Sequence, residues 1–116
     1  MEYLLGIDVG TSGTKSAVFT SDGTLVAEAP ASYPLYQPEN GWAEQDPNDW
    51  WRAVCETLRA VTEQVPAHRI CAVGLSGQMH GTVMLDEQGD VIGRAIIWCD
   101  GRTGEECREI ESRVGR

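Results

Sequence analysis

The sequence predicts an α/β fold in which helices cover a mixed β-sheet. Three β-like runs, at about residues 2–9, 13–20 and 24–33, precede the first helical pattern, and a further apolar run, "RICAVGLSG" at 69–77, follows it. Short consecutive strands form an antiparallel meander, whereas a strand reached through a helix favours parallel pairing. Both kinds of pairing are therefore expected in one sheet.

The first two strands are joined by "GIDVGTSGTKS" at 6–16, which contains three glycines and four hydroxyl side chains. The sequence argues against a P-loop, because Thr14 stands where that motif needs a glycine and no helix pattern follows. The dinucleotide fingerprint fails as well, since the glycines fall at 6, 10 and 13. The β-like run that follows the loop ends at the turn signal Asp22-Gly23, so a strand and not a helix is expected after the loop. Residues 6–16 are therefore predicted to form a strand, a turn and an antiparallel strand.

This turn has the composition of an anion site. Gly10 and Gly13 permit positive φ, so successive backbone N–H groups can surround an anion. Asp8 precedes the turn, and a carboxylate beside phosphate oxygens requires a cation such as Mg²⁺ between them. An ordinary hairpin with a Gly-rich turn and a solvated Asp8 fits the spacing equally well.

The middle of the chain predicts a loop at 34–47, which contains three prolines, and then an amphipathic helix at 47–65. Asp46 is the expected N-cap, with Pro47 in the first helical position and Pro66 ending the helix. The apolar positions recur every three or four residues, at Trp50, Val54, Leu58, Val61 and Val65.

The last third predicts a hairpin over 81–93 with its turn at 87–90, and then a short strand, "AIIWCD" at 95–100. Thr103 and Glu106 have the spacing of a capping box. They predict a second helix that ends near Gly115, with Cys107, Ile110 and Val114 on its apolar face.

Length and charge limit the classes of protein. The 116 residues fit one domain with a modest core, and the net charge of −9 argues against nucleic acid or an anionic membrane as the main partner. The N-terminus lacks a basic signal region and "YLLGI" is too short to span a membrane, so a cytoplasmic protein is expected. The four cysteines form no C-x-x-C motif; buried, reduced thiols are expected, and no zinc site.

A mixed sheet with a phosphate turn between its first two strands is the arrangement of the actin-like, ribonuclease H-like ATPase fold. The chain resembles the N-terminal portion of the FGGY-family carbohydrate kinases through four stretches spread along its length: "GIDVGTSGTK" at 6–15, "GWAEQDPNDWW" at 41–51, "GLSGQMHGTVMLD" at 74–86 and "AIIWCDGRTGEEC" at 95–107. The segments "SGQMHG" and "WCDGR" within the last two stretches favour the xylulokinase branch. Glycerol kinases have an Arg-Glu pair where Met79 and His80 stand.

The resemblance implies ATP and Mg²⁺ as cofactors. It implies that Asp8 is associated with Mg²⁺ and that the ATP phosphates lie near four residues of the turn: Thr11, Ser12, Gly13 and Lys15.

The resemblance also implies a sugar pocket built from Gln78, Met79, His80, Trp98 and Asp100. From the residues alone, His80 reads as a turn residue and Trp98 as core, although Gly77 and Gly81 would allow the segment between them to turn into a cleft. Asp100 and Arg102 have two interpretations, as sugar ligands or as partners of each other. The other three tryptophans are expected to anchor the core or loops: Trp42, Trp50 and Trp51.

The implied activity is ATP-dependent phosphorylation of a sugar. The expected substrate is D-xylulose, which would give D-xylulose 5-phosphate, and the alternatives are glycerol, gluconate and ribulose. Residues 1–116 are expected to form the first part of an incomplete N-terminal kinase domain, inactive alone. By resemblance, the proton-accepting aspartate and the adenosine-binding domain lie beyond residue 116, and the full-length enzyme is expected to be a homodimer. Two other classes remain open: a non-catalytic truncated domain, and an actin-like ATPase of the chaperone or cell-wall type.

Overall fold

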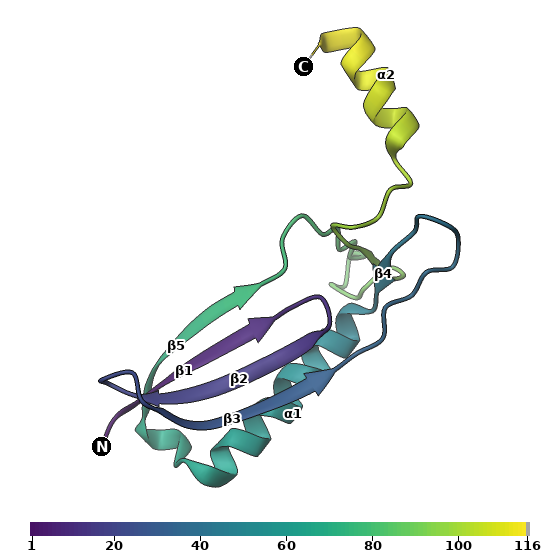
Figure 1. Ribbon diagram of the computed structural model, residues 1–116. Helices are drawn as coiled ribbons and strands as arrows, with labels where there is room; N and C mark the ends of the chain where they lie inside the picture. The colour runs from purple at the N-terminus through teal and green to yellow at the C-terminus, as the bar shows by residue number, and fades with distance from the viewer. Residues whose placement is uncertain (116) are drawn as a thin grey trace.

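The computed structural model describes residues 1–115, and its main feature is a four-stranded mixed sheet in the order β3-β2-β1-β5. Strands β1 (Tyr3–Val9), β2 (Gly13–Thr20) and β3 (Leu25–Ser32) form an antiparallel meander. Strand β5 (Ile70–Gly77) lies parallel to β1 at the edge of the sheet (Figure 1). The predicted mixed sheet is therefore confirmed.

The stretch that joins β1 and β2 is a strand-turn-strand, as the sequence predicts. Asp8 pairs with Lys15 and Val9 with Thr14 across the two antiparallel strands. Lys15 lies inside β2, which continues to Thr20, so no helix begins there. This arrangement excludes the P-loop topology on structural grounds.

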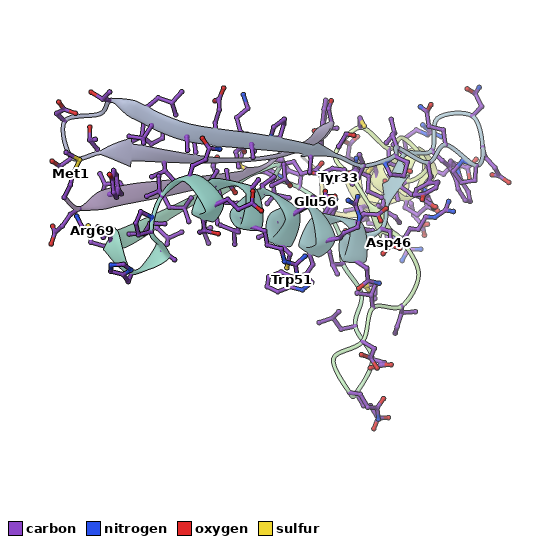
Figure 2. All side chains as sticks on the ribbon, turned by 90° about the horizontal axis from the view of Figure 1, so that it is seen from below. Met1, Tyr33, Asp46, Trp51, Glu56 and Arg69 are labelled. Carbon is purple, nitrogen blue, oxygen red and sulfur yellow. The ribbon has the colours of Figure 1, made fainter. Side chains whose placement is uncertain are left out.

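Helix α1 (Pro47–Gln64) covers one face of the sheet, and the core lies between the two. Its N-cap forms as expected, since the Asp46 carboxylate accepts a hydrogen bond from the backbone N–H of Asn48 at 2.9 Å. Figure 2 shows α1 lying along the sheet, with Trp51 pointing away from it. The core cluster between helix and sheet contains Leu5, Ile7, Val18, Ala27, Ala29, Val61 and Val65.

One contact in this helix–sheet interface is polar. Ser16 of β2 and Thr57 of α1 are both buried, and their hydroxyl oxygens lie 2.7 Å apart. The Thr57 hydroxyl also lies 3.0 Å from the carbonyl oxygen of Val54, to which it donates. Because each hydroxyl has a partner, burial of this pair carries no unsatisfied group.

A second, two-stranded sheet lies beyond the main one. Strand β4 (Glu44–Gln45), which falls in the predicted loop, pairs antiparallel with β6 (Ala95–Ile96). The short 3₁₀ helix η1 (Ala67–Arg69) leads from α1 into β5. The predicted hairpin over 81–93 is reduced to a single bridge between Leu85 and Val91. The strand expected at 95–100 is also shorter than predicted, since β6 contains only Ala95 and Ile96.

Helix α2 (Gly104–Val114) exists, but the capping box predicted at its start does not form. Thr103 is the N-cap residue, yet its side chain makes no capping hydrogen bond, with φ −96° and ψ 21° in place of an extended backbone. The expected apolar face is also exposed, since Ile110 is 61% and Val114 77% accessible. Figure 1 shows α2, in yellow, extending away from the sheet.

Burial on β5 differs from the sequence prediction too. Val73 and Leu75 face the same side as Leu5 and Ile7, with which they pair in register, but they are 55% and 79% exposed. Helix α1 packs mainly on β2 and β3, so the edge strand lies outside its cover. The apolar run therefore predicted the strand correctly. Within residues 1–115, however, no element covers this face of β5, so its side chains stay exposed.

One core cluster forms between α1 and the sheet, but residues 1–115 as a whole are extended rather than compact. The radius of gyration is 18.1 Å, whereas a compact domain of 100 residues has about 13 Å. The cysteines follow the same pattern: all four are free, but Cys55 is only half-buried and Cys71, Cys99 and Cys107 are exposed. Trp51 is 69% exposed, so it is not a core anchor within residues 1–115, which corrects its expected role.

Two features are absent from residues 1–115. No helix there is long and apolar enough to cross a bilayer. In the same residues, no cluster of three or more His, Cys, Asp and Glu side chains is placed to hold a metal ion.

Candidate functional site

The turn between β1 and β2 is closed by its own backbone. The N–H of Gly10 donates to the carbonyl of Gly13 at 2.9 Å. Neither glycine adopts the positive φ that it would permit. Gly13 is required for close approach instead, because a Cβ there would lie 2.5 Å from the carbonyl oxygen of Ala31 on β3.

Tyr33 makes hydrogen bonds to residues at both ends of this turn. Its hydroxyl donates to the carbonyl of Gly10 and lies 3.4 Å from the hydroxyl of Thr14, which donates to it. Burial raises the pKa of the Tyr33 hydroxyl, so it remains a proton donor at neutral pH. The turn is consequently held on both flanks, by β3 and by Tyr33.

One side of the turn borders a hollow of about 330 Å³, which we call the Lys15 hollow. Its lining residues are Asp8, Ser12, Gly13, Thr14, Lys15, Pro30, Ala31 and Ser32. Lys15 is exposed, and within residues 1–115 it forms one loose ion pair, with its Nζ 3.9 Å from Glu28. An exposed pair of this length holds the ammonium weakly, which leaves Lys15 able to reach an anion.

Asp8 lies at the edge of the Lys15 hollow and fits a metal-associated role. Leu5 and Ile7 face the core, so Asp8 lies on the uncovered face of the sheet, where it is exposed. Mg²⁺ in nucleotide sites is bound through one or two carboxylates, with water and phosphate oxygens supplying the other ligands. A single accessible carboxylate beside a hydroxyl-rich turn matches that donor set.

The other side of the turn borders a hollow of about 300 Å³, which we call the His80 hollow. It is lined by Thr11, Gln78, Met79, His80 and Trp98. Met79 and Trp98 are 71% and 56% exposed, so they offer apolar surface to the hollow. The indole N–H of Trp98 donates to the hydroxyl of Thr11 at 2.9 Å. Four of the five predicted sugar residues thus line one hollow. Thr11, which the resemblance assigns to the phosphates, lines the same hollow.

His80 has a backbone conformation that marks this segment. Its φ is 63°, the one positive value outside glycine within residues 1–115. The sequence suggested that Gly77 and Gly81 would provide the turn; the left-handed residue is His80 itself. Gly77 serves close packing, since a Cβ there would lie 2.9 Å from the carbonyl oxygen of Val9. Strained backbone of this kind is concentrated at functional sites.

The fifth predicted sugar residue, Asp100, makes its contacts within the protein. Its carboxylate is 2% exposed and accepts hydrogen bonds from the backbone N–H of Ala43 at 2.7 Å and from the Arg102 guanidinium at 2.6 Å. Hydrogen bonding from Arg102 holds the pKa of Asp100 well below its ordinary value. Of the two interpretations left open for this pair, the structure shows mutual pairing.

Arg102 extends that pair into a larger cluster. Its guanidinium also lies 2.8 Å from Glu44 of β4 and 3.7 Å from the centre of the Trp42 ring. The cluster therefore fixes the segment before α1 to the segment after β6. Trp42 is confirmed as a loop anchor.

The sequence did not single out Gln45, which is fully buried behind the turn and hydrogen-bonded to the backbone of Thr11. The signal available was its place in "GWAEQDPNDWW", one of the four matching stretches.

Comparison with known proteins decides the family. Residues 3–116 match the model of the N-terminal domain of the FGGY family of carbohydrate kinases. The chain belongs to the FGGY family. Within residues 1–115, the hollows on either side of the turn therefore lie in an FGGY N-terminal domain.

Individual relatives agree with this assignment. The chain is 40% identical to the xylulose kinase of Escherichia coli K12 over 110 residues, which cover 95% of this chain and 23% of that protein. It is 38% identical to the gluconokinase of Bacillus subtilis 168 over 97% of this chain and 22% of that protein. The chain thus spans about a quarter of the length of the relatives it matches.

Solved structures show the same fold. The ligand-bound xylulose kinase of Lactobacillus acidophilus superposes with a TM-score of 0.92 at 30% identity, covering 99% of this chain and 23% of that one. The mixed sheet is accordingly part of the actin-like ATPase fold of these sugar kinases.

Proposed function

We propose that this chain supplies the phosphate-side surface and part of the sugar pocket of an ATP-dependent sugar kinase. The observation that carries the proposal is the division made by the turn at 10–13. Ser12 lines the Lys15 hollow, while its neighbour Thr11 lines the His80 hollow. A phosphoryl group held at one side and a sugar hydroxyl held at the other would meet at this turn.

On the phosphate side, Ser12 and Lys15 would bind phosphate oxygens, with Asp8 holding Mg²⁺. Lys15 contributes positive charge and Ser12 a hydroxyl donor, and both line the Lys15 hollow. The bound Mg²⁺ would neutralise charge on the phosphates during transfer. The carboxylate base that accepts the proton of the sugar hydroxyl is proposed to lie outside residues 1–116.

On the sugar side, the apolar faces of Trp98 and Met79 would pack against the carbon skeleton. The imidazole of His80 can donate or accept a hydrogen bond to a hydroxyl group. Gln78 borders the same hollow. Asp100 is proposed to act indirectly: its contacts with Ala43 and Arg102 would fix the segment that carries Trp98.

D-xylulose is the first candidate substrate. Its support is the set of xylulose kinases among the relatives and the Met79-His80 pair in the His80 hollow. D-gluconate is the second candidate, because a gluconokinase is 38% identical to the chain.

The test is ADP release by the complete enzyme with D-xylulose, D-ribulose, D-gluconate and glycerol, each over a full concentration range. We expect D-xylulose to have the highest kcat/KM by roughly tenfold or more, since hydroxyl-recognising sites discriminate strongly. A higher value for D-gluconate would overturn the xylulose assignment and keep the sugar kinase. Absence of sugar-dependent ADP release with all four compounds would contradict the proposed function itself.

A further inference from the structure

Gln45 is the most deeply buried large polar side chain of the described core, with 0% of its surface exposed. It comes from the two-residue strand β4, just before α1. A buried amide is costly unless its donors and acceptors have partners. The partners of Gln45 therefore show what its burial achieves.

Those partners come from three separate elements. The Nε2 of Gln45 donates to the carbonyl of Thr11 in the turn at 2.5 Å. Its Oε1 accepts one hydrogen bond from the indole N–H of Trp50 on α1 at 3.0 Å and another from the Nε2 of Gln78 at 2.8 Å. One side chain thus connects the turn, the helix and the segment that follows β5.

Gln78 reinforces this connection. Its Nε2 lies 3.4 Å from the carbonyl of Gly10, to which it donates, so both of its amide hydrogens are directed at Gln45 and the turn. Its own Oε1 is buried and has no hydrogen-bond partner among residues 1–115. A buried, unpaired acceptor is unfavourable. The two donated bonds therefore fix the orientation of this amide.

We infer that Gln45 is a positioning residue that holds the phosphate turn and the Gln78–His80 segment in one fixed relation. The inference rests on the proposed function. Thr11 and His80 line the same hollow, and a phosphoryl donor and a hydroxyl acceptor react only when they are correctly placed. A displacement of about 1 Å at such a site costs on the order of a hundredfold in rate. Gln45 touches no proposed substrate group; it acts through Thr11 and Gln78.

The experiment uses the complete enzyme with Gln45→Met, which keeps the length of the side chain and removes all three hydrogen bonds. We expect kcat for D-xylulose to fall roughly 10- to 100-fold. The dissociation constants of D-xylulose and of ADP, measured separately by calorimetry, should stay within about threefold of wild type. This split follows because each half of the site stays intact while their relation is lost.

Two matched variants separate positioning from general loss of stability. Thr57→Val removes a buried hydrogen bond to Ser16 in the core, away from both hollows. Gln64→Met makes the same chemical change at an exposed position at the end of α1. Both variants should keep the wild-type kcat. If Thr57→Val lowered kcat as far as Gln45→Met does, loss of stability would explain the effect and the inference would fail.

A second variant decides the question if Gln45→Met does not fold. Trp50→Phe retains the ring on α1 and removes only the indole N–H that donates to Gln45. We expect a 2- to 10-fold lower kcat with unchanged sugar affinity, as the loss of one ordinary hydrogen bond predicts. An unchanged kcat in the variant that folds, or a loss of sugar affinity that accounts for the whole effect, would overturn the inference. A wild-type enzyme inactive on every sugar tested would contradict the proposed function instead, before any variant is compared.

Discussion

The indole N–H of Trp98 donates a hydrogen bond to the hydroxyl of Thr11, with 2.9 Å between nitrogen and oxygen. Both residues line the His80 hollow. The resemblance assigns Thr11 to the phosphates and Trp98 to the sugar, so this bond lies where the two sides of the proposed site meet. Because Thr11 accepts from the indole, its own hydroxyl hydrogen is left to donate to another acceptor. A phosphoryl oxygen at the turn is the acceptor that the proposed function supplies.

This bond predicts a specific effect for Trp98→Phe in the complete enzyme. Phenylalanine keeps an aromatic face for the sugar but has no donor for Thr11. Loss of one such hydrogen bond costs about 0.5–1.5 kcal/mol, which corresponds to a roughly 2- to 10-fold lower kcat, with the sugar KM nearly unchanged. Steady-state kinetics checks this.

The companion variant is Trp98→Ala, which removes the face as well and should raise the sugar KM too. If Trp98→Phe raised the KM as much as Trp98→Ala does, Trp98 would act on the sugar through its N–H, and the proposed link to Thr11 would be incorrect.

The Asp100–Arg102 pair predicts a pH-dependent contribution to stability. Arg102 holds the pKa of Asp100 below its ordinary value of 3.8. A carboxyl whose pKa is lowered by folding stabilises the folded state above its unfolded pKa, and this contribution is lost as the pH falls towards the folded pKa. Asp100→Asn should therefore lower the urea midpoint of the complete enzyme at pH 6, and this difference from wild type should shrink below about pH 4.

A matched surface variant is Asp86→Asn, in the exposed turn that it forms with Gln88 and Asp90. It should have a smaller effect at pH 6. A difference between wild type and Asp100→Asn that stayed constant from pH 6 to pH 3 would show that the charge of Asp100 is not what stabilises this segment.

The buried contact between Ser16 and Thr57 predicts coupling in a double-mutant cycle. Thr57→Val leaves the buried Ser16 hydroxyl unpaired, which should cost about 1–3 kcal/mol in the free energy of unfolding. Ser16→Ala combined with Thr57→Val should cost less than the sum of the two single variants, because no unpaired group remains. Urea unfolding of all four proteins measures this. Strict additivity would mean that the 2.7 Å contact contributes nothing.

The isolated 116-residue chain is predicted to have no sugar kinase activity. The chain spans about a quarter of the length of the relatives it matches, and the base and the adenosine-binding domain are proposed to lie outside residues 1–116. Purified chain should release ADP at the same background rate with and without D-xylulose. Sugar-dependent release above that rate would place the base within this segment.

Features fixed by neighbouring residues were predictable from the sequence. Asp46 and Pro47 define the start of α1 through contacts within one turn of helix, and the Gly-rich turn between β1 and β2 forms where it was expected. Features that depend on distant partners were not. The burial of β5 was overestimated, because an apolar run shows what a strand can bury and not what covers it. The same holds for α2, whose Ile110 and Val114 remain exposed.

The candidate site shows the same division. Thr11, Met79, His80 and Trp98 were found by motif, and the structure places them around one hollow. The burial of Gln45 was not predicted, since a glutamine between Glu44 and Asp46 has the local pattern of a polar loop. Its burial arises from Thr11, Trp50 and Gln78, which lie in other parts of the chain.

The central claim is that the turn separates a phosphate side from a sugar side, and the kinetics of Asp8→Ala and His80→Ala in the complete enzyme test it most directly. Asp8→Ala should lower kcat about a hundredfold, on the order of 3 kcal/mol, with little change in the sugar KM. His80→Ala should weaken sugar affinity by roughly 1–3 kcal/mol through a lost hydrogen bond, with a smaller effect on kcat. If Asp8→Ala chiefly raised the sugar KM while His80→Ala left it unchanged, the assignment of the two sides would be contradicted.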